Sequence, residues 1–384
     1  MRGSVAIAGV GLAGCGEAPG WTEMEIAAAA AKNALDDAGL TARDVDGIVI
    51  ASTNIFMSGL ALAEHLGVRP KFTESSMVGG SSFVGHLIPA MLALNAGLCD
   101  TILVAYGSNQ RTGTGRAEAG RHKMALDPQV FEHPYKPFNP PTSYALAAAR
   151  HMHQYGTTRA QLAEIAVAAR QWAQLNPEAF ARDPLTLEDV LDSRMISDPL
   201  TVRDCCLVTD GGGAYVLTRA GRGKALKKAP AYLLGVGAAH WHRQISSMPD
   251  LTVTAATESG QRAFGMAGLG PRDIDVVELY DAFTINTLLF LEDLGFCKKG
   301  EGGAFVSGGR IAPGGELPVN TNGGGLSCVH PGMYGIFLLI EAVRQLRREA
   351  GDRQVRDAAV ALAHGNGGVL SSQITAILGT QDTL

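Results

Sequence analysis

The chain has 384 residues and a formal net charge of -5, and 46% of its residues are hydrophobic whereas only 18% are charged. This length and composition predict two cores or one large duplicated core, exclude an intrinsically disordered protein, and argue against a nucleic-acid partner. No apolar run approaches the ~20 residues of a membrane-spanning helix, and the six cysteines show no CxxC spacing, so we expect reduced thiols in a cytoplasmic protein.

The first predicted element is a buried strand at residues 5–9, which glycines follow. Residues 9–14, GVGLAG, match the GxGxxG spacing of dinucleotide sites, which requires a helix to open directly at the glycines. The next helix begins only near Glu23, and no acidic residue follows the strand that ends at Ala51 and Ser52. We therefore interpret the stretch as a glycine-rich strand exit and do not expect an NAD oxidoreductase.

Residues 32–52, KNALDDAGLTARDVDGIVIAS, return at residues 261–281 as QRAFGMAGLGPRDIDVVELYD, at a constant offset of 229 residues. Seven of these 21 positions are identical, which indicates an internal duplication. In each copy a helix then leads into a strand, at residues 79–107 and 333–365, and an additional strand ends the copy. Strands that alternate with helices predict an α/β fold with a mostly parallel sheet.

A long insertion interrupts the first copy between about residues 110 and 210. It is rich in proline and aromatic residues at residues 133–144 and helical in character at residues 151–174. Insertions of this size with their own helices commonly form a lid or a substrate-binding layer. We expect a first half over residues 1–225, including the insertion, and a second half over residues 226–384.

Residues 75–87, SSMVGGSSFVGHL, are typical of a loop that turns into a helix. A helix start offers free N–H groups and a favourable dipole to a nucleophile, yet this stretch contains no cysteine. Ser81 and Ser82 are poor substitutes, because a serine nucleophile needs an adjacent base. We expect Gly80 and Ser81 to contact a substrate here.

The second copy carries three candidate acid–base groups. Tyr280 follows a predicted strand, at the carboxyl end where ligands bind in open α/β sheets; the alternative is a buried tyrosine with a satisfied hydroxyl. His330 stands in the glycine-rich loop at residues 320–335, and His364 stands in the turn at residues 361–368. A lone histidine is more often structural, but one in such a loop is a candidate acid or base.

The same two loops contain the remaining candidate substrate contacts. Glycines let a backbone approach a ligand closely, and the asparagines beside them can hydrogen-bond to it. The expected contacts are Asn322, Gly323, Gly324, Gly365 and Asn366. We expect neither a metal site nor a bound cofactor.

Four stretches resemble motifs of the thiolases: NGGGLSCVHPG, YDAF, HGNGG and DPLTVRDCCLVTDGGGAYVL. The chain is similar to the sterol-carrier-protein-type branch of that superfamily over nearly its whole length. The resemblance implies the thiolase fold, in which two duplicated βαβαβαββ halves pack in layers and the N-terminal half carries a large insertion. It also implies a homodimer and an acyl-CoA substrate, so that coenzyme A enters as part of the substrate.

The departures from the family pattern concern the catalytic groups. In thiolases a cysteine at the start of the third helix of the N-terminal half takes up the acyl group, and the resemblance puts Met77 or Gly80 at that position. Tyr280 replaces an asparagine or histidine, and His364 or its neighbour replaces the cysteine of the last loop. His330 is the retained catalytic-type residue.

Without a thiolate, the resemblance favours aldol or retro-aldol chemistry over Claisen thiolysis. Tyr280 and His330 would stabilise an enolate, and His364 would act as a base or proton shuttle. Some cysteine-lacking members of the branch are similar steroid aldolases that work with a small OB-fold partner protein. We therefore expect an enzyme of lipid, steroid or aromatic acid degradation.

Two alternatives remain open. In the first, the chain is a non-catalytic acyl-CoA or lipid-binding subunit. In the second, it is an acyltransferase of the acetyl-CoA acetyltransferase type. For the second alternative Cys328, two residues from His330, is a candidate nucleophile, although it lies in a different loop from the family cysteine.

Overall fold

The central sheet of the computed structural model has nine strands among residues 1–113 and 129–384, the part of the chain that the structure describes. Their order is β3-β2-β4-β7-β1-β8-β11-β10-β9. The first half supplies β1 (Val5–Gly16), β2 (Gly47–Ile50), β3 (Phe72–Glu74), β4 (Thr101–Ser108) and β7 (Asp210–Arg219). The second half supplies β8 (Ala231–His240), β9 (Val276–Leu279), β10 (Val360–Gly367) and β11 (Ser372–Gly379).

The strand order shows the duplication, because the second half repeats the first in mirror order. β2 and β4 are parallel, as are β9 and β10, and in each half two antiparallel strands follow toward the middle of the sheet. Val319 forms a parallel bridge with Val277 and takes the place that β3 has beside β2. The halves join where β1 pairs with β8, at Ala6–Tyr232 and Ile7–Ala231.

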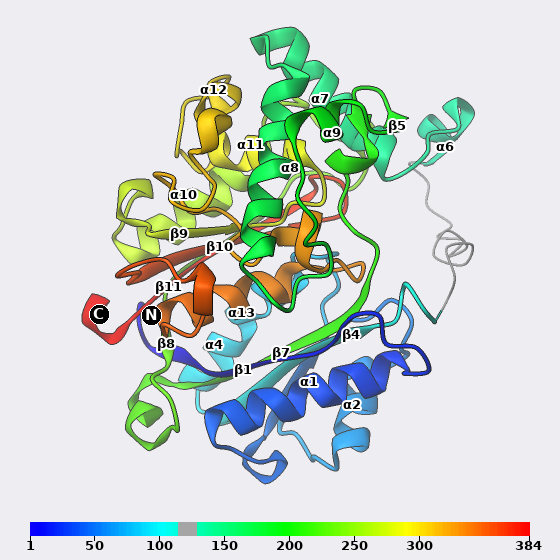
Figure 1. Ribbon diagram of the computed structural model, residues 1–384. Coiled ribbons are helices and arrows are strands. Elements are labelled where there is room, and N and C mark those ends of the chain that lie inside the picture. The colour runs from blue at the N-terminus through cyan, green and yellow to red at the C-terminus, as the bar shows by residue number, and fades with distance from the viewer. Residues whose placement is uncertain (114–128) are drawn as a thin grey trace.

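Helices lie on both sides of each half-sheet and between the two (Figure 1). In the first half they are α1 (Glu23–Ala38), α2 (Ser58–Leu66), α3 (Ser82–Gly85) and α4 (Leu87–Asn95). In the second half they are α10 (Ala256–Ala267), α11 (Thr284–Asp293), α12 (Gly302–Val306) and α13 (Gly335–Leu346). α1 covers the outer face of β1, β4 and β7, and α10 covers β8 and β11, whereas α3, α4 and α13 fill the central layer.

Glycines in the strands explain how closely the outer helices approach the sheet. A Cβ on Gly9 would lie 2.2 Å from the carbonyl oxygen of Ala34 in α1, and a Cβ on Gly235 would lie 2.1 Å from that of Ala263 in α10. The GVGLAG stretch therefore lies inside β1 rather than at its exit, and no helix opens at its glycines. This geometry excludes the dinucleotide interpretation of the stretch.

The insertion forms a layer over the second half, at the top of Figure 1. Its described elements are α6 (Gln129–Glu132), α7 (Pro141–Tyr155), α8 (Arg159–Gln174), α9 (Leu187–Leu191), β5 (Met195–Ser197) and β6 (Leu200–Thr201). The helical stretch expected at residues 151–174 is two helices, because Gly156 adopts a left-handed conformation and ends α7. α8 packs on α11 and α12. The expected division of the chain at residue 225 falls in the connection between β7 and β8.

Candidate active site

A cavity of about 730 Å³ opens where both halves and the insertion meet. Five of the residues singled out in the sequence line it: Met77, Gly80, Tyr280, His330 and Asn366. They come from the loop before α3, the end of β9, the loop before α13 and the end of β10. The carboxyl ends of neighbouring parallel strands and the start of a central helix thus meet in one place.

Tyr280 is almost fully buried at the wall of this cavity. Its hydroxyl donates to the carbonyl oxygen of Gly332 at 3.3 Å and accepts from the N–H of Tyr334 at 3.1 Å. Burial raises the pKa of the phenol well above its ordinary value. The tyrosine is therefore a neutral hydrogen-bond donor, and its long bond to Gly332 is one that a substrate oxygen could replace.

The ring of Tyr280 fills the space that a side chain at position 80 would need. A Cβ built on Gly80 would lie 2.2 Å from Cε2 and 2.4 Å from Oη of Tyr280, closer than atoms of two residues can approach. The backbone of Gly80 cannot move away from the ring, because it packs against Gly335 in α13, where an added Cβ would lie 2.2 Å from the carbonyl oxygen of Gly80. With Tyr280 in this position, position 80 holds no side chain at all, and therefore no nucleophile.

His330 stands beside Tyr280, with the two ring centroids 5.6 Å apart and the planes at 83°. Its backbone N–H donates to Oγ1 of Thr209 at 3.0 Å, and Nε2 of its ring is buried without a hydrogen-bond partner among the described residues. Burial lowers the pKa of the imidazole to about 4, so the ring is neutral at physiological pH. A neutral imidazole with an unsatisfied nitrogen can accept or deliver a proton.

Tyr334 is a residue of this cluster that the sequence interpretation missed. Its ring is fully buried, lies edge-on to Tyr280 at 5.7 Å and stacks on His330 at 6.2 Å. Its hydroxyl donates to Oδ1 of Asn322 at 2.9 Å. The position, four residues after His330 at the start of α13, was a possible signal. Tyr334 thus holds both the Tyr280 hydroxyl, through its N–H, and the His330 ring.

Residues 320–329 of the glycine-rich loop support the cavity and do not line it, so Asn322, Gly323 and Gly324 are not where the sequence interpretation placed them. Asp281 holds the loop: its Oδ1 accepts from the N–H of Gly325 at 2.6 Å and its Oδ2 from that of Leu326 at 3.3 Å. A Cβ on Gly324 would lie 2.0 Å from this carboxylate. Burial raises the pKa of Asp281 to about 7.

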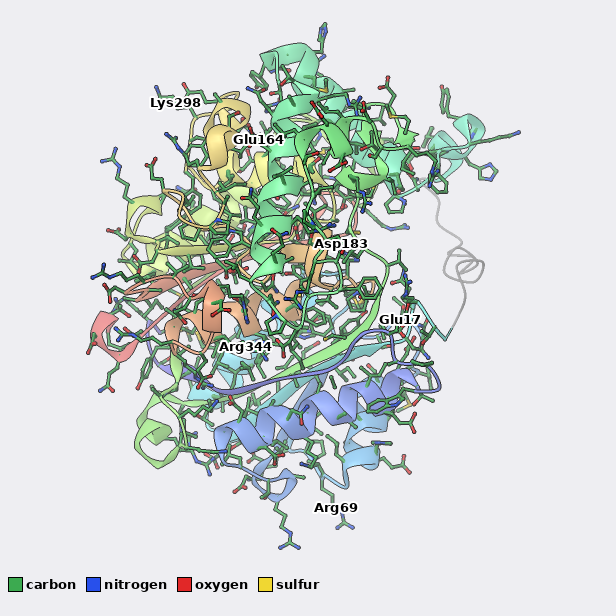
Figure 2. All side chains as sticks on the ribbon, in the orientation of Figure 1. Glu17, Arg69, Glu164, Asp183, Lys298 and Arg344 are labelled. Atoms are coloured by element: carbon green, nitrogen blue, oxygen red, sulfur yellow. The ribbon has the colours of Figure 1, made fainter. Side chains whose placement is uncertain are left out.

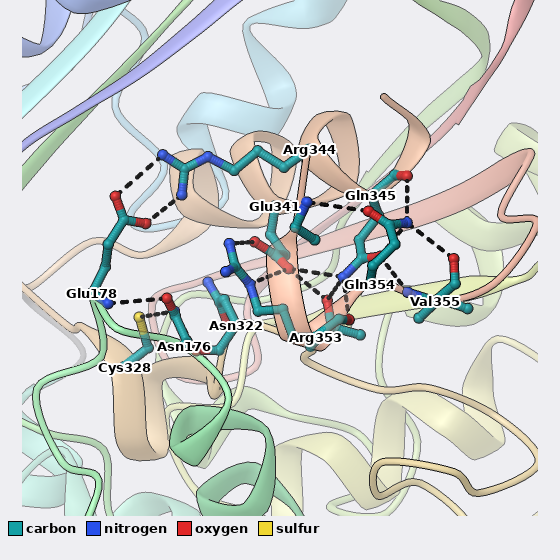
Figure 3. Close-up of polar contacts among 12 residues, drawn as sticks. Asn176, Glu178, Asn322, Cys328, Glu341, Arg344, Gln345, Arg353, Gln354 and Val355 are labelled. Atoms are coloured by element: carbon teal, nitrogen blue, oxygen red, sulfur yellow. Dashed lines mark hydrogen bonds and ion pairs between the residues drawn. The ribbon is translucent and has the colours of Figure 1, made fainter. Parts of the chain in front are cut away.

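A buried polar network anchors the other side of the loop (Figure 3). Arg353 donates through Nε and Nη2 to the two carboxylate oxygens of Glu341, at 2.9 and 3.0 Å. Asn176 of the insertion donates to the carbonyl oxygen of Asn322 at 2.9 Å and approaches Sγ of Cys328 at 3.5 Å. Burial raises the pKa of the Cys328 thiol well above its ordinary value. Cys328 is therefore an inert thiol outside the large cavity.

His364 is not placed to act as a base or shuttle. It lies inside β10 rather than in a turn, is fully buried, and does not line the cavity. Its Nδ1 hydrogen-bonds to Thr375 and its Nε2 to Gln373, both at 2.9 Å. Since both ring nitrogens are occupied by neighbours on β11, the geometry gives His364 a structural role and corrects the expectation.

Ser81 and Gly365 also lie behind the cavity wall. The Ser81 hydroxyl is fully buried and hydrogen-bonds to that of Ser372 at 2.8 Å. A Cβ on Gly365 would lie 3.0 Å from Cα of Ser81, so this glycine lets the start of α3 approach β10. Neither residue is placed to contact a substrate, and both position the loop that carries Gly80.

The insertion supplies further cavity residues that the sequence interpretation did not name. The Tyr144 ring stacks on Phe283 at 4.3 Å, and its hydroxyl accepts from Nδ2 of Asn366 at 3.0 Å. Cys206 also lines the cavity, and burial raises the pKa of its thiol. Tyr144 is the last residue of the proline- and aromatic-rich stretch in the insertion expected to form a lid or a substrate-binding layer, and that stretch was the available signal.

Known proteins identify the family of the chain. A family model described as thiolase C-terminal domain-like matches residues 237–380. The 17-hydroxy-3-oxo-4-pregnene-20-carboxyl-CoA lyase of Mycobacterium tuberculosis is 33% identical over 364 residues, which cover 90% of this chain and 92% of the lyase. The chain belongs to the thiolase superfamily. The predicted family and the predicted thiolase fold are thereby confirmed.

Two further relatives of this thiolase-superfamily protein bear on its chemistry. The acetyl-CoA acetyltransferase of Methanothermobacter thermautotrophicus is 34% identical over 374 residues, which cover 95% of this chain and 96% of that enzyme. A solved structure described as the Ltp2-ChsH2(DUF35) aldolase superposes with a TM-score of 0.90 at 32% identity, and the match covers 99% of this chain and 98% of that one. Relatives with similar sequence identity to this chain are thus named as a lyase, an aldolase and an acetyltransferase.

Two negative findings apply to residues 1–113 and 129–384. No three His, Cys, Asp or Glu side chains in these ranges are grouped so that they could hold a metal ion. None of the helices there combines the length and the apolar character needed to cross a membrane.

Proposed function

We propose that this chain cleaves a carbon–carbon bond in a β-hydroxyacyl-CoA by a retro-aldol reaction, or forms it in the reverse direction, without an acyl-enzyme. The observation that carries the proposal is the position of the Tyr280 ring in the space beside Gly80. The loop before α3, where the family resemblance puts the nucleophilic cysteine, contains Met77 and Gly80 and no cysteine. Thiolytic chemistry through a covalent intermediate therefore has no nucleophile there.

A retro-aldol reaction requires a base and an enolate stabiliser, and the cavity offers one of each. Neutral His330, with Nε2 unpaired among the described residues, takes the proton of the β-hydroxyl. The bond between the α and β carbons then breaks and leaves a thioester enolate. The Tyr280 hydroxyl donates to the enolate oxygen, a role for which a neutral phenol has precedent. The proton held on His330 can return to the α carbon.

The cavity also suits a large acyl group. Its lining includes Met77, Phe283, Val369 and two tyrosines besides Tyr280, and its volume of about 730 Å³ lies within the range of small-molecule sites. The lyase of Mycobacterium tuberculosis is named for a steroid carboxyl-CoA substrate. We propose an acyl-CoA of steroid, other lipid or aromatic acid degradation as the substrate of this chain. Its six cysteines are free, which fits the reducing cytoplasm.

Two exposed apolar surfaces support partners for the chain. Near the edge strand β3, the side chains of Phe56, Met57 and Leu60 are exposed, and we propose that this edge forms a homodimer. In the insertion, Phe131 and Tyr135 are 76% and 85% exposed. This second surface is available to a small OB-fold partner, and the Ltp2-ChsH2(DUF35) aldolase is itself named with a second component.

The decisive experiment compares two substrates with the purified chain. A β-hydroxyacyl-CoA should yield a ketone or aldehyde and a shortened acyl-CoA, measured by liquid chromatography and mass spectrometry. A β-ketoacyl-CoA with free CoA should give no thiolysis above background. Efficient thiolysis would refute the aldol proposal in favour of an acyltransferase. Tight acyl-CoA binding without turnover of either substrate, with and without an OB-fold partner, would make the chain a binding subunit.

A further inference from the structure

A second pocket lies behind the wall of the large cavity. It has a volume of about 180 Å³, and Cys206 lines both spaces. Three arginines line it, Arg111, Arg170 and Arg203, together with the hydroxyl-bearing Ser327. Its described lining contains no acidic residue. A small pocket with positive charge and no carboxylate is chemically suited to an anion.

Arg170 is the strongest feature of this pocket. It belongs to α8, is only 4% exposed, and donates through Nε to Oγ of Ser327 at 3.0 Å and through Nη1 to the carbonyl oxygen of Asp183 at 2.8 Å. None of the described residues places a carboxylate within 4 Å of its guanidinium. A buried cation without a counter-ion is costly, because both partners here are uncharged groups.

Arg203 adds a second positive charge. It lies in the turn Val202–Asp204, is exposed, and forms no ion pair within the described residues. Burial and the nearby charge of Arg203 both lower the pKa of Arg170, and the Asp183 carboxylate opposes them. The two guanidiniums thus repel each other, and an anion between them would remove the repulsion.

The acids around the pocket are engaged elsewhere. Glu17 pairs with Arg111 at 2.6 Å, so this arginine is already neutralised. Asp189 accepts from Thr186 at the start of α9, and Asp204 accepts from Thr201 and Thr284. Figure 2 labels Asp183, on the segment that follows α8, and Glu17, directly after β1. Asp183 also acts on Arg170, and Asp189 on Arg203, but neither acid forms an ion pair with these arginines, so among the described residues both guanidiniums remain able to pair with a ligand.

We propose that this pocket binds a phosphate-class oxyanion, which Arg170 and Arg203 hold between their guanidiniums. The planar fork of arginine matches the oxygens of a phosphate group, and Ser327 can supply a further hydrogen bond. The volume admits a phosphate group but not a whole coenzyme molecule. The anion comes either from free inorganic phosphate or from a phosphate group of coenzyme A. The assignment does not depend on the proposed reaction.

The test measures binding of inorganic phosphate to the full chain by calorimetry, with chloride at matched ionic strength as the reference. Arg203→Gln should weaken phosphate binding at least tenfold, because it removes one of two charged partners. Arg182→Gln removes another exposed arginine of the insertion, one that does not line the pocket, and it should leave the affinity unchanged. Arg203 is exposed, so its replacement should not unfold the chain.

Two results would overturn the proposal: phosphate that binds no better than chloride, or equal losses in Arg203→Gln and Arg182→Gln. Competition then identifies the source of the anion. If coenzyme A displaces phosphate and dephospho-coenzyme A does not, the ligand is the 3′-phosphate of the coenzyme. If neither displaces it, the pocket binds free phosphate.

Discussion

Replacement of Gly80 by alanine tests whether Tyr280 and position 80 share one space. The added methyl group would stand 2.2–2.5 Å from three atoms of the Tyr280 ring and hydroxyl, and Gly335 blocks a retreat of the Gly80 backbone. The tyrosine must therefore move, and its two hydrogen bonds, to Gly332 and from Tyr334, are lost or lengthened. Position 80 is thus predicted to tolerate no side chain.

The expected size of the effect follows from these contacts. Overpacking of a core typically costs about 1–3 kcal/mol, and each lost hydrogen bond costs about 0.5–1.5 kcal/mol. With two hydrogen bonds affected, we expect Gly80→Ala to lower the free energy of unfolding by about 2–6 kcal/mol. Turnover of a β-hydroxyacyl-CoA should fall by about 10²–10³-fold, because an enolate-stabilising donor is displaced.

The assay is urea denaturation combined with the cleavage assay, and Gly265→Ala is the matched control. Gly265 lies within α10 with nothing within 4 Å of its added Cβ, so the same substitution there should raise stability by about 0.5–1 kcal/mol. A double-mutant cycle isolates the collision, since Tyr280→Ala removes the ring that Gly80→Ala would strike. If Gly80→Ala destabilises the protein equally with and without the Tyr280 ring, the reasoning is refuted.

Three further predictions follow from the site. Tyr280→Phe and His330→Ala should each lower turnover by about 10²–10³-fold and leave the acyl-CoA affinity nearly intact. If the two side chains share one task, the double variant should lose much less activity than the product of the two single losses. Normal turnover in Tyr280→Phe would remove the tyrosine from the mechanism. Mass spectrometry after incubation with a short acyl-CoA should show no adduct, whereas a stable adduct between residues 75 and 84, or on Cys328, would overturn the non-covalent proposal. Burial lowers the pKa of His330 and His364 from 6.5 to about 4, so as the pH falls the unfolded chain binds protons before the folded protein does. Between pH 7 and pH 5 each histidine should therefore lower the free energy of unfolding by about 2 kcal/mol. In urea titrations His364→Gln should show a smaller loss of stability over this pH range, and an unchanged loss would contradict the assignment.

The sequence by itself determined the fold of this protein and five of the residues that line its cavity. The gap-free repeat of residues 32–52 at 261–281 predicted two similar halves, and those halves form the mirrored strand order of the sheet. Tyr280 and His330 could be identified because each follows a recognisable strand or precedes an apolar helix. Such patterns depend on residues that are close together in the chain, so they can be recognised without knowing which distant residues pack against them.

Only the tertiary structure decided which of the candidates face the cavity. His364 looked like a loop residue, but β11 pairs with β10 as far as Gly367 and thereby keeps the histidine inside the sheet. Likewise, nothing near Gly80 in the sequence shows that a ring two hundred residues away fills its side-chain space, and nothing near Gly324 shows that Asp281 holds the loop. The end of a strand, the space left for a side chain and the partner of a buried hydrogen bond all depend on residues that are distant in the chain. Tertiary packing determines these features, and local propensity does not.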